Sequence, residues 1–452
     1  MVTARLLSLA GLVSLAQAFA FPEGCEPRQV HIAGGADASK SLSVSWVTDG
    51  SECGDFSSVS YSSDGWTKSV GNAAPSSPTR YNQTTTKYGT YVSPYLWNCE
   101  LPDLAADTEY SFAFGATQPS PPSPPSPSYS FKTAPSATSS PSSSLYPTKI
   151  AMVGDLGQTS DSASTVANIA KEEVDFIAHA GDMSYADCDH DRWDSWFDMV
   201  EDVSSNTPWY VVGGNHEIEH SDVDGEIFVA YENRFNMPKI KPAEMEPFTG
   251  ETSCTPSAFL GKYDWGNSFY KFAHGPSTFL MLNSYTDSAP GSPQYAWVES
   301  TLAGIDREAT PWVFALFHSP FYNSFSDHQG EEQQILMKSS MEDLFIKYRV
   351  NAAFSGHVHG YERTNNVAHE ALDPAGPMYV IIGDGGNREG HASGFLDSTP
   401  PVWSAFRDNT IFGHALVTLL NETHAEFTWE KNVAEGVFET ADSFIMENQY
   451  YL

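Results

Sequence analysis

Residues 174–189, VDFIAHAGDMSYADCD, contain the pattern that decides the fold. An apolar run ends at Gly181-Asp182, and Tyr185 follows three residues later in an acidic segment. A short apolar run that ends in a glycine turn is typical of a buried strand. An aspartate at the end of a strand is ordinary, so the tyrosine beside it is the residue that needs a reason.

The same pattern recurs along the chain from Thr148 onward. The apolar runs that end in a polar cluster are KIAMVGD (149–155), VDFIAHAGD (174–182), WYVVGGNHE (209–217), WVFALFHSP (312–320), NAAFSGHVH (351–359) and MYVIIGDGG (378–386). Amphipathic segments lie between them, such as 191–200 with Trp193 and Trp196 on one face, and predict helices. Buried strands joined by helices indicate an α/β sheet, which binds ligands beyond the carboxyl ends of its strands. We therefore expect the polar clusters to converge.

The residue types at these strand ends indicate a metal site. Each cluster alone is compatible with a turn or a structural histidine, but the first five follow one another in one domain and all carry Asp, Asn or His. In a strand, the two histidines of HVH point to the same face, which suits metal ligation. Such ligands can hold two cations about 3.5–4 Å apart, which clamp the attacking and leaving oxygens of a phosphoryl transfer. The clusters contain no cysteine, which favours hard ions over a Cys-rich zinc site.

Two further regions precede the α/β part. Residues 1–20 have the positive start, apolar core and small-residue cleavage site of a secretory signal peptide. Residues 22–133 are expected to be all-β, because LSVSWV (42–47), EYSFAF (109–114) and SYSF (128–131) alternate in the period of a strand. A Pro/Ser-rich segment joins the last two, which predicts an extended hairpin connection. Residues 134–147 have the composition of a linker to the domain 148–452.

The charge of the chain limits its partners. The 452 residues carry a formal net charge of −34, which favours solubility and disfavours nucleic acid and anionic membranes as partners. After the signal peptide, no segment is long and apolar enough to span a membrane. The same charge should repel a phosphate ester, unless bound cations make the site locally positive.

The cysteines and sequons fit an oxidising compartment. We expect one disulfide among Cys25, Cys53 and Cys99, and a second between Cys188 and Cys254. With five cysteines, at least one thiol remains. The sequons Asn82-Gln-Thr and Asn421-Glu-Thr offer glycosylation sites in a protein of this compartment.

The motifs resemble those of a known enzyme family. GDLG (154–157), GDMSYAD (181–187), GNHE (214–217), FHSP (317–320) and GHVHGYER (356–363) stand in the order found in the purple acid phosphatases, a branch of the binuclear metallophosphoesterases. The similarity covers nearly the whole mature chain, from RQVHIAGG (28–35) to the C-terminal segment. It implies an α/β metallophosphoesterase sandwich, with two mixed sheets flanked by helices, preceded by an all-β fibronectin type III-like domain.

The resemblance assigns a role to each motif residue. It implies that the ligands of a ferric ion are Asp155, Tyr185 and His359. It implies that the ligands of a divalent ion, Zn, Mn or Fe(II), are Asn215, His318 and His357. Asp182 would bridge the two ions, and His216 would contact the phosphate and protonate the leaving group.

The sequence departs from the family after SPFYNSFSD. Plant members often carry two adjacent histidines there, whereas this chain has Asp327-His328. His328 is expected to retain a general-acid or phosphate-contact role, but Asp327 offers no positive charge to the substrate. Among the other polar residues, Asp384 is expected to hold a turn, and Glu362 and Arg363 to support the site by hydrogen bonding.

The resulting expectation is a secreted or vacuolar acid phosphatase. It would hydrolyse small-molecule phosphate monoesters with a hydroxide bound at an Fe(III)–M(II) centre. One alternative is a nucleotide pyrophosphatase or phosphodiesterase on the same two metals, with residues 225–250 deciding the pocket. A remote alternative from another class is a non-catalytic secreted binding protein that uses its Pro/Ser loop.

Overall fold

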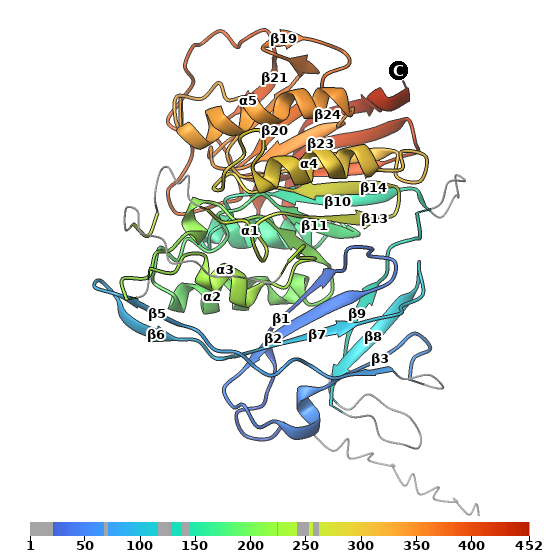
Figure 1. Cartoon of the computed structure of the whole chain (residues 1–452), viewed down its shortest axis with the longest axis vertical. Helices are drawn as coiled ribbons and strands as arrows, with labels where there is room; N and C mark the ends of the chain where they lie inside the picture. Colours follow the sequence, from blue (N-terminus) through green and yellow to red (C-terminus); the bar gives the residue numbers. More distant parts are fainter. Residues whose placement is uncertain are drawn as a thin grey trace, which may run out of the picture.

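A computed structural model gives the fold. It describes residues 21–451 except 67–70, 116–125, 127, 138–144, 224, 242–252 and 256–261. The expected signal peptide, nearly all of the Pro/Ser-rich connection, the middle of the linker and the end of the segment 225–250 (residues 242–250) therefore lie outside the described residues. The chain forms an N-terminal β sandwich beneath a larger α/β part (Figure 1).

The N-terminal region is all-β, as expected. Its first sheet has the order β1-β2-β7 and contains β1 (Arg28–Gly34), β2 (Leu42–Thr48) and β7 (Tyr95–Leu101). Its second sheet has the order β4-β3-β8-β9 and contains β3 (Val59–Ser62), β4 (Gly71–Ala73), β8 (Glu109–Phe114) and β9 (Ser128–Lys132). β8 and β9 pair antiparallel, which confirms the predicted hairpin. Aromatic side chains such as Trp46, Trp97 and Phe114 fill the core between the sheets.

A two-stranded arm extends from this sandwich. β5 (Asn82–Thr85) and β6 (Gly89–Val92) pair antiparallel and lie alongside α2 (Asp191–Ser204) in Figure 1. The arm reaches the segment that follows the GNHE motif, where Gln83 Nε2 donates to the Glu219 carbonyl at 2.8 Å. Thr86 N donates to Asp222 Oδ2 at 2.8 Å, and Asp222 N donates to the Thr84 carbonyl at 3.1 Å.

The α/β part contains two mixed sheets. The first has the order β12-β11-β10-β22-β23-β24, and its strands are β10 (Thr148–Val153), β11 (Phe176–His179), β12 (Trp209–Val211), β22 (Gly413–Leu419), β23 (His424–Ala434) and β24 (Val437–Glu447). The second has the order β13-β14-β15-β16-β20-β17-β21, and its strands are β13 (Tyr270–His274), β14 (Ser277–Met281), β15 (Trp312–Leu316), β16 (Ala352–Ser355), β17 (Tyr361–Thr364), β20 (Met378–Ile382) and β21 (Ser404–Asp408). The predicted apolar runs are parallel strands in these sheets.

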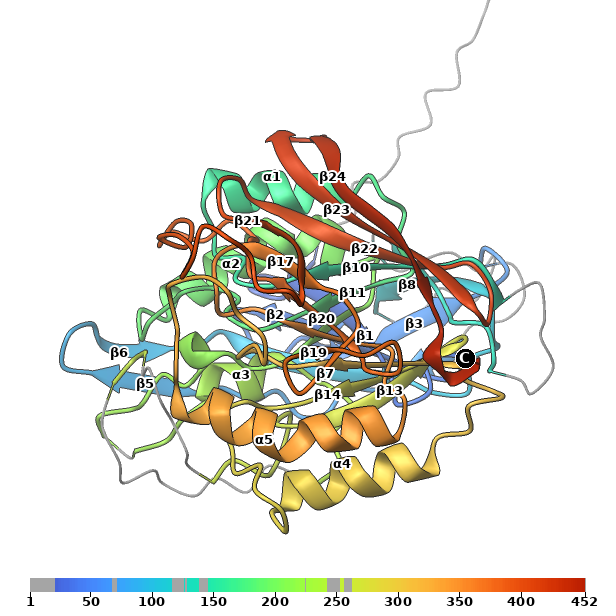
Figure 2. The same ribbon diagram turned by 90° about the horizontal axis from the view of Figure 1, so that it is seen from above.

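Helices cover the outer faces of the paired sheets. α1 (Ser160–Ile169) and α2 lie on the side of the first sheet, and α4 (Pro293–Gly304) and α5 (Glu332–Lys347) lie together over the second (Figure 2). The short helix α3 (Val229–Arg234) lies next to α2 in Figure 1. As predicted, α2 buries Trp193 and Trp196. The short elements are β18 (Val367–Ala368), β19 (Ala371–Leu372) and the 3-10 turns η1 (Gly54–Ser57), η3 (Asn215–Glu217) and η4 (Gln449–Tyr451). The expected two mixed sheets flanked by helices are confirmed.

One hydrophobic cluster of the α/β part extends into the sandwich, which also has the separate core described above. Ala33 and Val47 of the N-terminal sheet belong to the same buried cluster as Trp193 of α2. Beside this core, Arg234 is 2% exposed and donates to Tyr81 Oη at 2.9 Å and to Tyr91 Oη at 2.7 Å. The two tyrosines belong to the N-terminal region, so a buried guanidinium links the two parts.

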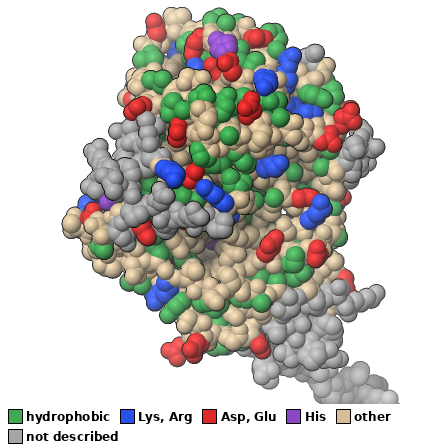
Figure 3. Space-filling view, viewed as in Figure 1, with side chains coloured by type: hydrophobic (Ala, Val, Ile, Leu, Met, Phe, Trp, Pro, Cys, Tyr) green, Lys and Arg blue, Asp and Glu red, His purple; other side chains and the backbone are tan. Residues whose placement is uncertain are grey.

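The cysteines pair as expected. Cys25 bonds to Cys53, and Cys188 bonds to Cys254, while Cys99 is a buried thiol. Asn82 is exposed at the start of the arm. In the described part of the chain, none of the helices combines the length and apolar character that a membrane crossing needs. Asp and Glu side chains are spread over the viewed face with Lys and Arg between them, so the charge there forms no single patch (Figure 3).

Candidate metal centre

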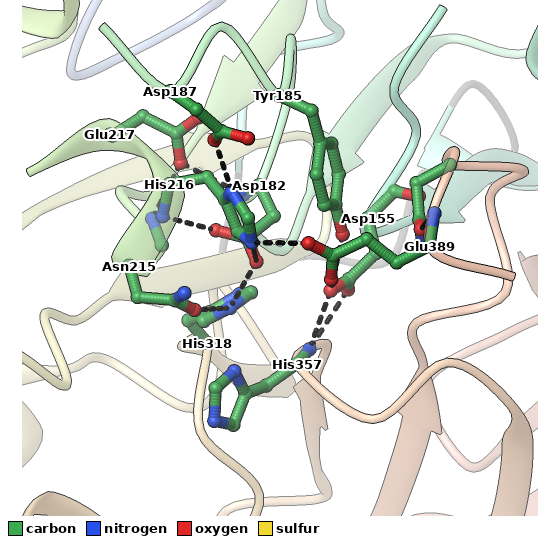
Figure 4. Close-up of polar contacts among 12 residues, drawn as sticks. Asp155, Asp182, Tyr185, Asp187, Asn215, His216, Glu217, His318, His357 and Glu389 are labelled. Atoms are coloured by element: carbon green, nitrogen blue, oxygen red, sulfur yellow. Dashed lines mark hydrogen bonds and ion pairs between the residues drawn. The ribbon is translucent and has the colours of Figure 1, made fainter. Parts of the chain in front are cut away.

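The carboxyl ends of five parallel strands bring the motif residues together. Asp155 follows β10, Asp182 follows β11, and Asn215 follows β12. His318 follows β15, and His357 follows β16 of the other sheet. Figure 4 shows these side chains pointing toward one another from separate loops.

Glycines are needed where these loops approach. A Cβ at Gly214 would lie 2.0 Å from Asp182 Oδ1, and a Cβ at Gly356 would lie 2.2 Å from Asp155 Oδ2. Both glycines directly precede a motif residue. Gly214, before Asn215, and Gly356, before His357, therefore leave room for the carboxylate of a neighbouring loop.

Three donors of the predicted ferric set lie in mutual contact. Tyr185 Oη is 3.3 Å from Asp155 Oδ1 and 3.1 Å from His359 Nε2. His359 Nε2 lies 3.5 Å from Asp155 Oδ1. Two ligands at right angles with bonds of about 2.1 Å lie about 3 Å apart, so this spacing fits a shared ion.

The predicted divalent set forms a second group beside the first. His318 Nε2 is 3.0 Å from Asp182 Oδ2 and 3.2 Å from Asn215 Oδ1. Ligand atoms of Asp182, His318 and His357 lie within 4.8 Å of one another, and all three residues are buried. The structure therefore brings together all seven predicted ligands.

Hydrogen bonds orient the three histidines toward this cluster. His318 Nδ1 lies 2.7 Å from the Ala180 carbonyl, and His359 Nδ1 lies 3.1 Å from the Gly390 carbonyl. A carbonyl only accepts, so in both rings Nδ1 carries the proton and Nε2 offers its lone pair to the cluster. His357 is held the other way, because its Nε2 lies 2.7 Å from Glu331 Oε2 and its Nδ1 points inward (Figure 4). This donor set fits a pair of bound cations.

Glu217 fixes the loop that carries the bridging carboxylate. It accepts from Asp182 N at 2.8 Å, Met183 N at 2.9 Å and Gly214 N at 2.8 Å. Burial raises the pKa of Glu217 to about 7, and the charge of Asp182 adds to the effect. The last residue of GNHE thus joins two motif loops.

Two of the clustered donors, Tyr185 and His318, favour their protonated forms. Burial, with Asp155 and Asp182, raises the pKa of the Tyr185 phenol well above its usual 10. Asp182 overcomes the effect of burial and raises the pKa of His318 to about 9. Because ligands bind metals in deprotonated form, cation binding here must release protons.

His216 lies buried beside the cluster. Its ring packs on Tyr185 with centroids 4.1 Å apart, and its Nδ1 is 2.5 Å from Asp187 Oδ1. Its Nε2 lies 3.8 Å from both Asp182 Oδ2 and Glu389 Oε1. Burial lowers the pKa of His216, but Asp182 and Asp187 overcome this and raise it to about 10. These carboxylates therefore favour the protonated form of His216 at the edge of the candidate site.

His328 lies on the opposite edge and is more exposed. Its ring centroid is 3.9 Å from that of His357, and its Nδ1 is 2.9 Å from Glu331 Oε1. Its side chain is 35% exposed. The neighbouring Asp327 points elsewhere and accepts from Ser393.

Sequence reasoning missed four acidic residues that hold the site. Asp187 and Glu389 flank His216, Glu217 holds the motif loops, and Glu331 links His328 with His357. The spacing of Glu217 in GNHE and of Glu331 three residues after His328 is the available signal. Neither spacing identifies the partner across the site.

The residues expected to support the site, Asp384, Glu362 and Arg363, make different contacts. Asp384 Oδ2 accepts from Trp429 Nε1 at 2.7 Å. Glu362 accepts from Ser324 N at 2.8 Å and so holds the loop that leads to His328. The expectation for Arg363 is wrong, because its guanidinium pairs with Asp442 of β24 at 2.7 Å and joins the two sheets instead.

Three sequence families match the chain. Residues 27–133 match "Purple acid Phosphatase, N-terminal domain", residues 148–361 match "Calcineurin-like phosphoesterase", and residues 376–442 match "Iron/zinc purple acid phosphatase-like protein C". The matches follow one another along the chain and cover both the sandwich and the candidate metal centre.

Individual proteins are similar over long stretches. "Probable purple acid phosphatase 20" of Arabidopsis thaliana is 40% identical over 305 residues, which are 67% of this chain and 64% of that protein. "Fe(3+)-Zn(2+) purple acid phosphatase 12" of the same plant is 31% identical over 451 residues, 94% of this chain and 85% of that protein. The solved structure of a purple acid phosphatase from yellow lupin (Lupinus luteus) seeds shares the fold, with a TM-score of 0.75 over 94% of this chain and 75% of that chain at 21% identity.

Proposed function

Because the chain belongs to the purple acid phosphatase family, we propose that it hydrolyses phosphate monoesters at an Fe(III)–M(II) centre built from its seven clustered donors. The observation that carries this proposal is the phenol of Tyr185, which is in contact with Asp155 and His359. A phenolate is a hard anionic donor and favours Fe(III) over softer ions. Binding of a ferric ion would thus explain why Tyr185 stands in the acidic segment.

Each of the two groups of donors is proposed to hold one of the two ions. Asp155, Tyr185 and His359 would hold the ferric ion, while Asn215, His318 and His357 would hold the divalent ion, with Asp182 between them. The neutral amide and imidazole donors suit Zn, Mn or Fe(II). When bound, the two ions supply Lewis acidity and the activation of water for attack on phosphorus.

The residues around the donors position the substrate and move protons. Nearby carboxylates raise the pKa of His216, and its ring lies at the edge of the cluster, so His216 is the proposed proton donor to the leaving oxygen. Asp187 holds its Nδ1–H, so the Nε2–H, which lies 3.8 Å from Asp182 and Glu389, is the one proposed to reach the substrate. His328, partly exposed on the other edge, is the proposed second contact to the phosphate or its leaving group.

We also propose that the enzyme acts outside the cytosol. The sequence of residues 1–20 and the two disulfides support secretion or delivery to a vacuole. The acidic overall charge suits an acidic medium. Small phosphate monoesters of that compartment are the proposed substrates.

Metal analysis, a visible spectrum and paired rate measurements test this function. The purified protein should contain about one iron and one divalent ion per chain, be coloured, and hydrolyse a monoester faster than a diester of the same leaving group at pH 5. A faster diester would favour the phosphodiesterase alternative. Metal-replete protein that hydrolyses no phosphate ester would leave only a binding role, and a colourless protein with full iron would contradict the ferric assignment of Tyr185.

A further inference from the structure

Two loops face each other at the edge of the candidate site. Residues 323–331 carry His328 and Glu331, and Glu331 bonds to the proposed ligand His357. Residues 387–396 carry Glu389, which lies near His216, and the Gly390 carbonyl that orients His359. The relative position of these loops therefore sets how far His328, on one edge of the site, lies from Glu389 and His216 on the other.

The loops are joined by a short antiparallel strip. Leu396 N donates to the Ser324 carbonyl at 2.9 Å, and Ser326 N donates to the Gly394 carbonyl at 2.9 Å. Between these bonds Phe325 pairs with Phe395, with ring centroids 5.1 Å apart. Backbone pairing thus fixes the loops as far as Ser326.

Asp327 continues this connection with its side chain. Its Oδ2 accepts from Ser393 N at 2.6 Å, and its Oδ1 accepts from the Ser393 hydroxyl. Its own carbonyl accepts from Asn323 Nδ2 at 2.8 Å. The next residue, His328, has a φ of +54°, a left-handed conformation that non-glycine residues adopt only where their surroundings hold it.

We propose that Asp327 is a positioning residue that acts through His328. By binding Ser393, the Asp327 carboxylate fixes the turn from which His328 reaches Glu331 and the edge of the proposed metal pair. The carboxylate is thereby turned to the facing loop, so Asp327 is not a substrate contact. This role deepens the proposed function and rests on it.

The hydrogen-bond chemistry makes the role specific to a short side chain with two polar atoms. A carboxylate accepts both the N–H and the O–H of Ser393. An asparagine can accept the N–H with its Oδ1 and donate to the hydroxyl oxygen with its Nδ2, so Asp327→Asn should retain both contacts. Alanine retains neither contact.

A mutant cycle with His328 tests the proposal. Asp327→Ala and Asp327→Asn are made in the wild-type enzyme and in the His328→Ala background, and kcat/KM is measured on a phosphate monoester. Asp306→Ala is the matched control, because Asp306 also caps a turn by accepting two backbone N–H groups, but between α4 and β15. Metal content and the visible band are recorded for each variant.

The expected result is a loss that depends on His328. Asp327→Ala should lower kcat/KM about tenfold with metal content unchanged, since small misplacements of a catalytic group are costly. Asp327→Asn and Asp306→Ala should stay near wild type. In the His328→Ala background, Asp327→Ala should have no further effect.

Two outcomes would overturn the proposal. One is wild-type kcat/KM in Asp327→Ala, and the other is an equal loss with and without His328. A titration with inorganic phosphate in the same variants gives a readout that needs no turnover, and weaker phosphate binding is expected in Asp327→Ala. Failure of the proposed function is distinct, because it is seen in the wild-type enzyme as absence of hydrolysis with both metals present.

Discussion

At the scale of single residues, Tyr185 distinguishes this centre from other clusters of Asp, Asn and His. Its phenol is fully buried and lies between a carboxylate and an imidazole. Burial and the two nearby aspartates raise the pKa of the phenol, so only a strong cation can hold it as phenolate. The visible colour of the protein and its preference for Fe(III) should therefore depend on the Tyr185 side chain.

Tyr185→Phe should remove the visible absorption band of the purified protein. The ring still fills the space beside His216, so the fold should remain, but the anionic oxygen is lost. The measurements are the visible spectrum and the iron content. A Tyr185→Phe protein that keeps the band with full iron would show that another donor produces it.

Glu331→Ala should weaken binding of the divalent ion while iron is retained. Glu331 holds the Nε2–H of His357, and loss of such an outer partner typically lowers metal affinity about 10–100-fold. Metal content after dialysis against a chelator measures the effect. The exposed neighbour Glu332→Ala is the control, and equal loss of both metals from Glu331→Ala would contradict the selective role.

At the scale of elements, the apolar runs were sufficient to predict the strands that carry the site and the meeting of their ends. Asp155 and Asp182 follow buried parallel strands, and the rule for such sheets placed them together. No such rule predicts the contacts that the loops make with one another. The strip that joins Ser324 to Leu396 and the bond from Glu331 to His357 depend on turns whose sequences have no periodic pattern.

Glu219, between η3 and the arm, should make stability depend on pH. Burial raises its pKa to about 8, although Trp193 and Cys188 donate to it. The folded pKa exceeds the unfolded value near 4.5, so the contribution is fully present below that value and is lost as pH rises toward 8. The unfolding temperature should fall across this window.

Glu219→Gln should flatten this pH dependence, because an amide does not titrate. Scanning calorimetry between pH 4.5 and pH 8 compares the slopes, with the exposed Glu308→Gln as control. A slope in Glu219→Gln as steep as in the wild type would assign the pH dependence to other groups.

At the scale of the whole molecule, a buried cation connects the sandwich to the α/β part. Arg234 binds Tyr81 and Tyr91 of the N-terminal region, and it binds Asp194 of α2 at 2.8 Å. Tyr91 also donates to Asp194 Oδ2 at 2.8 Å. This network and the shared core should make the two parts unfold together.

Arg234→Met should lower the free energy of unfolding by about 3–5 kcal/mol, because it leaves the acceptors of the network without their charged donor. Calorimetry should also show the single transition broaden or split. Arg28→Met is the control, since the pair of Arg28 with Asp49 is exposed and should contribute less than about 1 kcal/mol. A loss in Arg234→Met no larger than in the control would mean that the core alone couples the parts.

The two-stranded arm has a consequence for how this protein can change over evolutionary time. Gln83 and Thr86 hold residues 219–222, which continue directly from the loop that presents Asn215 and His216. A graft that exchanges the sandwich for that of a relative would replace the arm without its receiving segment. The sandwich should therefore not be exchangeable on its own, and the sequences of the arm and of the GNHE loop should change together.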